Sequence, residues 1–137
     1  MSTTKFISFF AFLIFSISLI SCSGSDDSNS TNPGSRLVKY ELSGNYSGTL
    51  GLVYTNQDGA AQIEDNITLP WSKELTVGGN GMQVVLLTAS TEVGGFGQPG
   101  ETITGKIYVG GDLKETATVN STNTGYISLN NLAYALQ

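Results

Sequence analysis

The chain has 137 residues, of which 39% are hydrophobic and only 12% are charged, and its formal net charge is −5. It contains no histidine, which excludes Ser-His-Asp and Cys-His catalytic arrangements and removes the commonest zinc ligand. An acidic chain without a basic cluster is also unsuited to nucleic acid, whose phosphates must be neutralised by Lys or Arg. We therefore expect no nucleic-acid partner, no metal, no cofactor, no catalytic residue and no enzymatic activity.

The first 21 residues have the pattern of a cleaved export signal. Lys5 precedes an uncharged run from Phe6 to Ile20, and the only cysteine, Cys22, follows directly after Ser21. This run is shorter than the roughly 20 residues that span a bilayer as a helix, which favours a processed signal over a permanent anchor. Because the ending resembles a bacterial lipoprotein signal, we predict cleavage after Ser21 and attachment of lipid to Cys22. The alternatives are an ordinary signal peptide with an incidental cysteine, or an uncleaved signal anchor.

Residues 22–35 are rich in Gly, Ser and Asn and contain too little apolar surface to fold. We interpret them as a flexible tether with a reach of roughly 20 Å, carrying the lipidated cysteine at its start. The pair Asp26-Asp27 resembles the acidic signal that sends some lipoproteins to the cell surface. We expect a membrane-anchored protein outside the cytoplasm, at the outer membrane and on the cell surface, with a periplasm-facing anchor as the alternative.

Residues 36–137 lack helical periodicity and show short runs of strand-forming residues between turn residues, at intervals of about eight to twelve positions. This spacing is typical of an all-β sandwich or barrel. The expected strands are Arg36 to Leu42, Tyr46 to Tyr54, Ala60 to Leu69, Trp71 to Val77, Met82 to Ala89, Thr102 to Val109, Leu113 to Val119 and Tyr126 to Leu136. Seven to eight antiparallel strands pack most simply as two sheets, so we predict one immunoglobulin-like β-sandwich domain over 36–137.

Three features of this pattern predict details of the sheets. In the third run, Ile63 and Ile67 are expected to face inward, and Asp65 predicts a bulge or strand end where it interrupts their row. Pro70 cannot donate a ladder hydrogen bond, which places it at an edge or at a crossing between sheets. The segment from Met82 to Ala89 is apolar at successive positions, which predicts a central strand covered on both faces.

The segment from Gly95 to Gly100 matches the G-x-G-x-x-G string of dinucleotide-binding sites. That motif requires a helix N-terminus directed at the phosphates, whereas here Pro99 lies inside the string and a strand follows it. We interpret the segment as a loop between strands that exposes Val93 and Phe96. It is a candidate contact surface for a ligand or partner, with Phe96 as the candidate binding residue.

Two other aromatic residues are candidates for a sugar-stacking surface. Trp71 shares a strand face with apolar residues, so we expect it in the core. Tyr108 lies on the face opposite Ile103 and Ile107, which predicts an exposed ring. Tyr108 is therefore the second candidate binding residue.

The acidic residues suggest two further sites, neither of which we favour. A calcium site built from Asp58, Glu64 and Asp65 would need six to eight oxygen ligands, and no calcium-loop string is present. Glu74 and Glu92 could form the carboxylate pair of a glycosidase, but their spacing does not show that they converge. We interpret these acids as turn and solvent-facing residues.

Several segments resemble the MmpS-like family of small mycobacterial membrane proteins, and the likeness extends from Tyr40 to about Val119. It is carried by Tyr40 to Gly44, Tyr54-Thr55-Asn56 with Asp58-Gly59, Leu69 to Lys73, Gly81 to Ala89 and Gly105 to Gly111. The resemblance implies an immunoglobulin-like β-sandwich and a role beside large membrane transporters that export lipids and siderophores. It implies no catalytic residues. This chain departs from the family because a lipidated cysteine would replace the N-terminal transmembrane helix.

The resemblance and the lack of catalytic groups together predict a lipid-anchored, non-enzymatic accessory protein of the envelope. Its expected partners are the membrane, through the lipid anchor, and a membrane protein or transporter. The alternative is a surface module that binds a glycan or another extracellular ligand through Phe96 and Tyr108.

Overall fold

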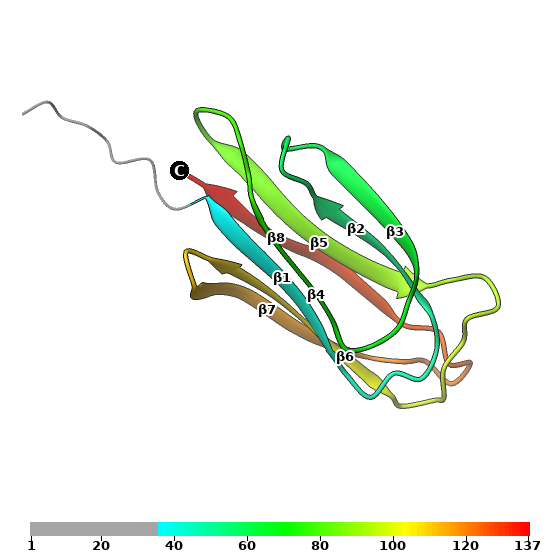
Figure 1. The fold of residues 1–137 in the computed structure, drawn as a ribbon. Coiled ribbons are helices and arrows are strands. Elements are labelled where there is room, and N and C mark those ends of the chain that lie inside the picture. Colours follow the sequence, from blue (N-terminus) through cyan, green and yellow to red (C-terminus); the bar gives the residue numbers. More distant parts are fainter. Residues whose placement is uncertain (1–35) are drawn as a thin grey trace, which may run out of the picture. The chain divides into compact units, whose positions relative to one another are not determined.

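The computed structural model describes residues 36–137, which form eight β-strands (Figure 1). The strands are β1 (Leu37–Gly44), β2 (Leu50–Thr55), β3 (Ala61–Ile67), β4 (Trp71–Thr76), β5 (Gln83–Thr91), β6 (Thr102–Val109), β7 (Asp112–Asn120) and β8 (Ser128–Leu136). The predicted signal peptide, the tether and Cys22 lie outside the described residues. Within residues 36–137, no helix is long and apolar enough to cross a membrane.

The strands form two four-stranded antiparallel sheets that pack face to face. The first sheet has the order β4-β1-β6-β7, and the second has the order β3-β2-β5-β8. The predicted immunoglobulin-like β-sandwich is therefore confirmed. Alternation along each strand explains the packing, because side chains at every second position point to the same side of a sheet.

The core lies between the two sheets and is made of the inward-facing rows. In β1 the row is Val38, Tyr40 and Leu42, and in β2 it begins with Leu50 and Leu52; all five side chains are inaccessible to solvent. Burying a side chain of this size contributes about 1.5–3 kcal/mol, so these rows account for much of the attraction between the sheets.

Of the two positions predicted for Pro70, a sheet edge or a crossing between sheets, the structure shows the crossing. Pro70 lies between β3 of the second sheet and β4 of the first, where the chain changes sheet. The glycine-rich segment 78–81 returns the chain to the second sheet, and the guanidinium of Arg36 binds it by donating to the carbonyl oxygens of Gly78 and Gly81. The start of β1 and the β4–β5 loop are thus held together at one end of the sandwich.

The predicted bulge near Asp65 is present, but the predicted orientation of Ile63 is wrong. Leu50 lies opposite Ile67 and Leu52 lies opposite Glu64, so β3 has one extra residue between these pairs. An extra residue in a strand moves the side chains on one side of the bulge to the opposite face of the sheet from the one that simple alternation predicts. Consequently Glu64 faces inward, and the side chain of Ile63 is 63% exposed on the outer face.

The predicted position of β5 is partly confirmed. It is a central strand between β2 and β8, and its inward residues Val85 and Leu87 are fully buried. The expectation that both faces are covered is wrong, because Val84 is 55% exposed on the outer face. The described residues contain no third layer that would cover it, since both sheets already face each other.

Candidate functional site

The glycine-rich string lies in the loop between β5 and β6, residues 92–101, as the sequence predicts. β5 ends and β6 begins at the end of the sandwich opposite to the start of β1, since Val38 pairs with Val109 at the far end of β6 (Figure 1). The loop therefore lies far from the point where the chain enters the domain at Arg36. We call this loop, with the side chains that hold it, the loop platform.

The hydroxyl group of Tyr46 holds the loop platform in place. It is 2.7 Å from the hydroxyl oxygen of Thr91 and lies near the carbonyl oxygens of Gly95 and Gly125, at 3.2 and 3.0 Å. It also accepts a hydrogen bond of 3.1 Å from the backbone N–H of Gly97. One buried side chain thus connects three separate segments of backbone.

Glycines in these segments allow the backbones to approach closely. A Cβ atom at Gly48 would lie 2.1 Å from the carbonyl oxygen of Gly95, and one at Gly125 would lie 2.0 Å from that of Gly97. A Cβ atom at Gly97 itself would lie 2.5 Å from the nearest ring carbon of Tyr46. No other residue fits at these positions without moving the loop.

The carboxylate of Glu101 forms the hydrogen bonds that hold the second half of the loop. Its Oε2 atom accepts hydrogen bonds from the backbone N–H and hydroxyl of Ser47, both at 2.9 Å, and from the N–H of Gln98 at 2.8 Å. These donors stabilise the ionised form, so the pKa of Glu101 lies below its ordinary value of 4.5. Hydrogen bonds to Tyr46 and to Glu101 therefore hold the backbone in both halves of the loop.

The apolar side chains of the loop point away from this network. Val93 is fully exposed and Phe96 is 54% exposed. A fixed loop that presents two apolar side chains can bind an apolar surface without losing further backbone freedom. This geometry is suited to contact with a partner rather than to acid–base chemistry.

The structure places Tyr108, the second predicted binding residue, away from Phe96. Tyr108 lies in β6 opposite Lys39 of β1, near the end where the chain enters the domain. The ammonium group of Lys39 is 5.5 Å from the centre of the Tyr108 ring, and it also pairs with Glu41 at 3.0 Å. The two aromatic rings therefore do not form one stacking surface, and one face of the Tyr108 ring is already occupied.

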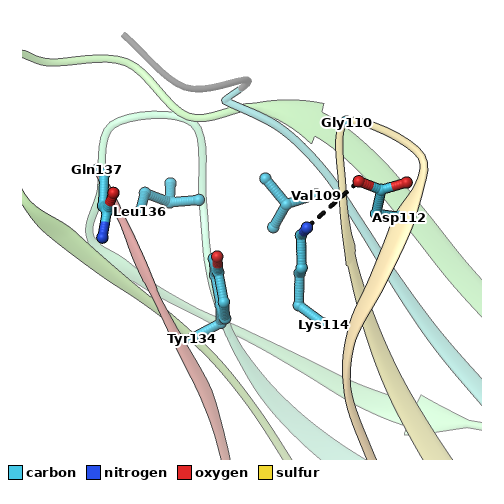
Figure 2. Close-up of a pocket in the computed structure, with 7 residues that line it drawn as sticks. All are labelled: Val109, Gly110, Asp112, Lys114, Tyr134, Leu136 and Gln137. Atoms are coloured by element: carbon cyan, nitrogen blue, oxygen red, sulfur yellow. Dashed lines mark hydrogen bonds and ion pairs between the residues drawn. The ribbon is translucent and has the colours of Figure 1, made fainter. Parts of the chain in front are cut away.

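A small pocket lies at the side of the sandwich where β7 and β8 are the edge strands (Figure 2). It has a volume of about 250 Å³ and includes Val109, Tyr134 and the ion pair between Lys114 and Asp112, whose atoms are 3.3 Å apart. The register shift between Ile107 and Tyr108 leaves Lys114 as the extra residue of β7. A bulge and charged side chains at an edge strand discourage pairing with another strand.

The acidic residues considered from the sequence are not gathered into one site. Glu64 faces inward and accepts hydrogen bonds from the hydroxyl of Tyr54 at 2.7 Å and the indole N–H of Trp71 at 3.2 Å. Glu92 instead accepts from the backbone N–H of Asn66, and Glu74 lies in the other sheet. Among residues 36–137, no group of three or more Cys, Asp or Glu side chains is arranged to hold a metal ion.

The cluster around Glu64 links the two sheets at the side opposite the pocket. Trp71 packs against the core as predicted, although it is only partly buried, and its ring lies 5.6 Å from that of Tyr54. Hydrogen bonding to Tyr54 is the main cause that lowers the pKa of Glu64. Burial, together with this hydrogen bond, raises the pKa of Tyr54 to about 12.

The sequence pattern indicated Phe96 but not the residues that hold its loop, Tyr46 and Glu101. Tyr46 itself is buried, like Leu50 and Leu52 of the strand that follows it. Its partners, however, lie 45 to 79 positions away in the chain. Local pattern carries no signal for contacts of that kind.

The fold and the loop platform define a small β-sandwich with a hydrogen-bonded loop that exposes two apolar side chains. The chain matches the family described as Mycobacterium membrane protein over residues 12–129. This covers most of the sequence, so the chain belongs to that family of membrane proteins, the MmpS family, as its sequence resemblance indicates. No individual curated protein matches it.

Proposed function

We propose that this protein is a lipid-anchored, non-enzymatic accessory subunit that contacts a membrane transport protein through its loop platform. The signal would be cleaved after Ser21 and Cys22 would carry the acyl chains, with residues 22–35 as the tether. Membership of the MmpS family supports membrane association and a transporter as the partner. The Asp26-Asp27 pair supports a position at the outer membrane and the cell surface.

The observation that carries this proposal is the fixed exposure of Val93 and Phe96. A mobile loop would lose backbone conformational entropy on binding, at a cost of about 1–2 kcal/mol for each residue that becomes ordered. Here Tyr46 and Glu101 have already fixed the backbone. A partner with an apolar pocket can accept Phe96 as an anchor, since buried aromatic residues dominate the binding energy of many interfaces.

The position of the loop platform also fits a tethered protein. The chain enters at one end of the sandwich and the loop lies at the other, separated by strands of up to nine residues, about 30 Å in length. With a tether of roughly 20 Å, the loop would reach up to about 50 Å from the membrane. The expected partner is therefore a membrane protein with a large domain outside the bilayer.

Photocrosslinking in intact membranes tests the proposed contact. Phe96→benzoylphenylalanine in the full chain is expected to yield one main adduct, identified by mass spectrometry as a membrane transport protein. Leu113→benzoylphenylalanine is the matched control, because Leu113 is similarly exposed (49%) and lies at the opposite end of the sandwich. The proposal fails if Phe96 gives no protein adduct, or if both positions give the same set.

A separate measurement tests the anchor. Intact-mass analysis of the purified native protein is expected to show a chain that begins at Cys22 with acyl chains attached. Cys22→Ser should remain unprocessed or leave the membrane fraction. An unmodified thiol on a chain that retains residues 1–21 would rule out the lipid anchor, while the loop contact could still be correct.

A further inference from the structure

Three of the four edge strands of the sandwich have features that discourage pairing with another strand. The edges are β3 and β4 on one side, and β7 and β8 on the other. Glu64 faces inward in β3, which also contains the bulge near Asp65, and β4 contains Lys73 and Glu74. β7 contains the bulge at Lys114. Bulges and charged side chains, including inward-facing ones, are the means by which natural sheets protect their edges.

The second half of β8 has none of these features. Residues 132–136 pair in unbroken register with residues 83–87 of β5, and the irregularity in this pair of strands lies before them along β8. This part of the strand contains no charged residue and no proline. Its outer side chains, Ala133 and Ala135, are small and exposed, so they do not cover the edge. An edge of this kind is a template for a further strand.

The hydrogen bonds of Thr55, at the end of β2, show the direction of the backbone groups in β5. The hydroxyl oxygen of Thr55 accepts from the N–H of Leu86 at 3.0 Å, and the hydroxyl donates to the carbonyl oxygen of Val84 at 3.4 Å. Leu86 and Val84 therefore direct their backbone groups toward β2. Successive residues of a strand direct theirs to opposite sides, so Val85 and Leu87 direct theirs toward β8.

This direction decides which backbone groups of β8 are unpaired. Tyr134 lies opposite Val85 and Leu132 lies opposite Leu87, so these two residues of β8 exchange hydrogen bonds with β5. Ala133 and Ala135 consequently direct their N–H and C=O groups away from the sheet. No strand of residues 36–137 lies on that side of β8, and no turn or loop there bonds these groups. We call these four backbone groups the free edge.

The pocket between β7 and β8 lies beside the free edge. It has a volume of about 250 Å³, and Figure 2 shows the side chains of Tyr134 and Leu136 across it from Val109 and Lys114. Asp112 also lines it, with a side chain that is 80% exposed. A strand added to β8 would direct every second side chain toward this pocket. Apolar side chains could pack there against Val109, and a basic one could pair with Asp112.

We propose that the free edge binds an extended segment of another protein, which adds to the second sheet as a fifth strand. In this mode of recognition, backbone hydrogen bonds provide affinity and pockets for alternate side chains provide specificity. Residues 36–137 contain five basic and nine acidic side chains, so the segment that complements them is alternately apolar and basic. The same net charge disfavours a second copy of this chain as the partner.

Selection from a phage-displayed library of random ten-residue peptides tests this proposal, with the purified full chain in detergent as the target. We expect the selected peptides to be alternately apolar and basic, without proline at their centre. In the unsubstituted chain they should slow hydrogen exchange at the amides of Ala133 and Ala135, which are otherwise unpaired. This measurement needs no variant, so it decides the question even if a substituted chain fails to fold.

Two substitutions at Ala133 separate backbone pairing from side-chain contact. Ala133→Pro removes an outward N–H without removing a hydrogen bond to β5, as is tolerated in edge strands. Ala133→Ser is the matched control, because it alters the side chain and keeps the N–H. We expect peptide affinity, measured by fluorescence anisotropy, to fall at least tenfold in Ala133→Pro and to stay within twofold in Ala133→Ser.

Four results would overturn the proposal. They are a selection that enriches no binding peptide, equal affinity in the two Ala133 variants, slowed exchange at another edge in place of β8, and a dimer of the unsubstituted chain that Ala133→Pro dissociates. Phe96→Ala should leave peptide affinity unchanged, because Phe96 lies in the loop beyond the other end of the sandwich. The proposed transporter contact is therefore judged separately.

Discussion

Glu64 offers the most direct test of how the two sheets are held together. Its carboxylate accepts from Tyr54 at 2.7 Å and from Trp71 at 3.2 Å, and Lys73 lies 3.4 Å away. A hydrogen bond to a charged group contributes about 1.5–3 kcal/mol, whereas the exposed Lys73 pair contributes about 0–1 kcal/mol. Glu64→Gln keeps one acceptor oxygen and its shape but loses the charge. We expect it to lower the free energy of unfolding by about 1–2 kcal/mol.

Urea unfolding of residues 36–137 at neutral pH measures this difference. Glu74→Gln is the matched control, because Glu74 is exposed in the neighbouring strand β4, and we expect it to change stability by less than about 0.5 kcal/mol. If Glu64→Gln is no more destabilising than Glu74→Gln, the cluster does not stabilise the sandwich and the reasoning is refuted.

The pH dependence of the same comparison gives a second test. The pKa of Glu64 is lowered in the folded protein from its ordinary value of 4.5. A lowered pKa stabilises the fold fully above the unfolded value, and this contribution is lost as the pH falls through the folded pKa. The gap in stability between wild type and Glu64→Gln should therefore be constant above about pH 5 and shrink below pH 4.5. A gap that stays unchanged down to pH 2 would show that the charge of Glu64 is not the cause.

Three further predictions concern the loop platform and the sheet register. Tyr46→Phe should lower the free energy of unfolding by about 1–3 kcal/mol and speed hydrogen exchange in the loop, whereas Tyr126→Phe, at an exposed ring, should do neither. NMR titration of the Glu101 carboxyl should give a midpoint below 4.5; a midpoint at or above that value would contradict its three donated hydrogen bonds. Ile63→Ala should change stability by less than about 0.5 kcal/mol while Ile103→Ala costs about 2–5 kcal/mol, and similar losses at both would show that Ile63 faces inward.

The family match places this protein among membrane proteins. Its loop platform lies beyond the end of β5, at the end of the sandwich opposite the chain entry at Arg36.

The sequence alone determined the features that depend on local order. Alternation placed Ile103 and Ile107 of β6 on the face opposite Tyr108, and both isoleucines are fully buried, because the period of two is a property of any strand. Turn residues located Pro70 at a sheet crossing, and glycine content located the loop that exposes Phe96. These signals lie within a few residues of the structure they specify.

Tertiary structure decided the features that depend on residues distant in the chain. The sequence indicated a bulge near Asp65 but did not show which residues of β3 before the bulge face inward. Pairing with β2 decided this, so Glu64 faces inward and Ile63 is exposed. The role of Tyr46 was likewise set by the segments that fold around it, up to 79 positions away. A local pattern specifies which residues alternate, whereas the partner strand decides which half of the alternation is buried.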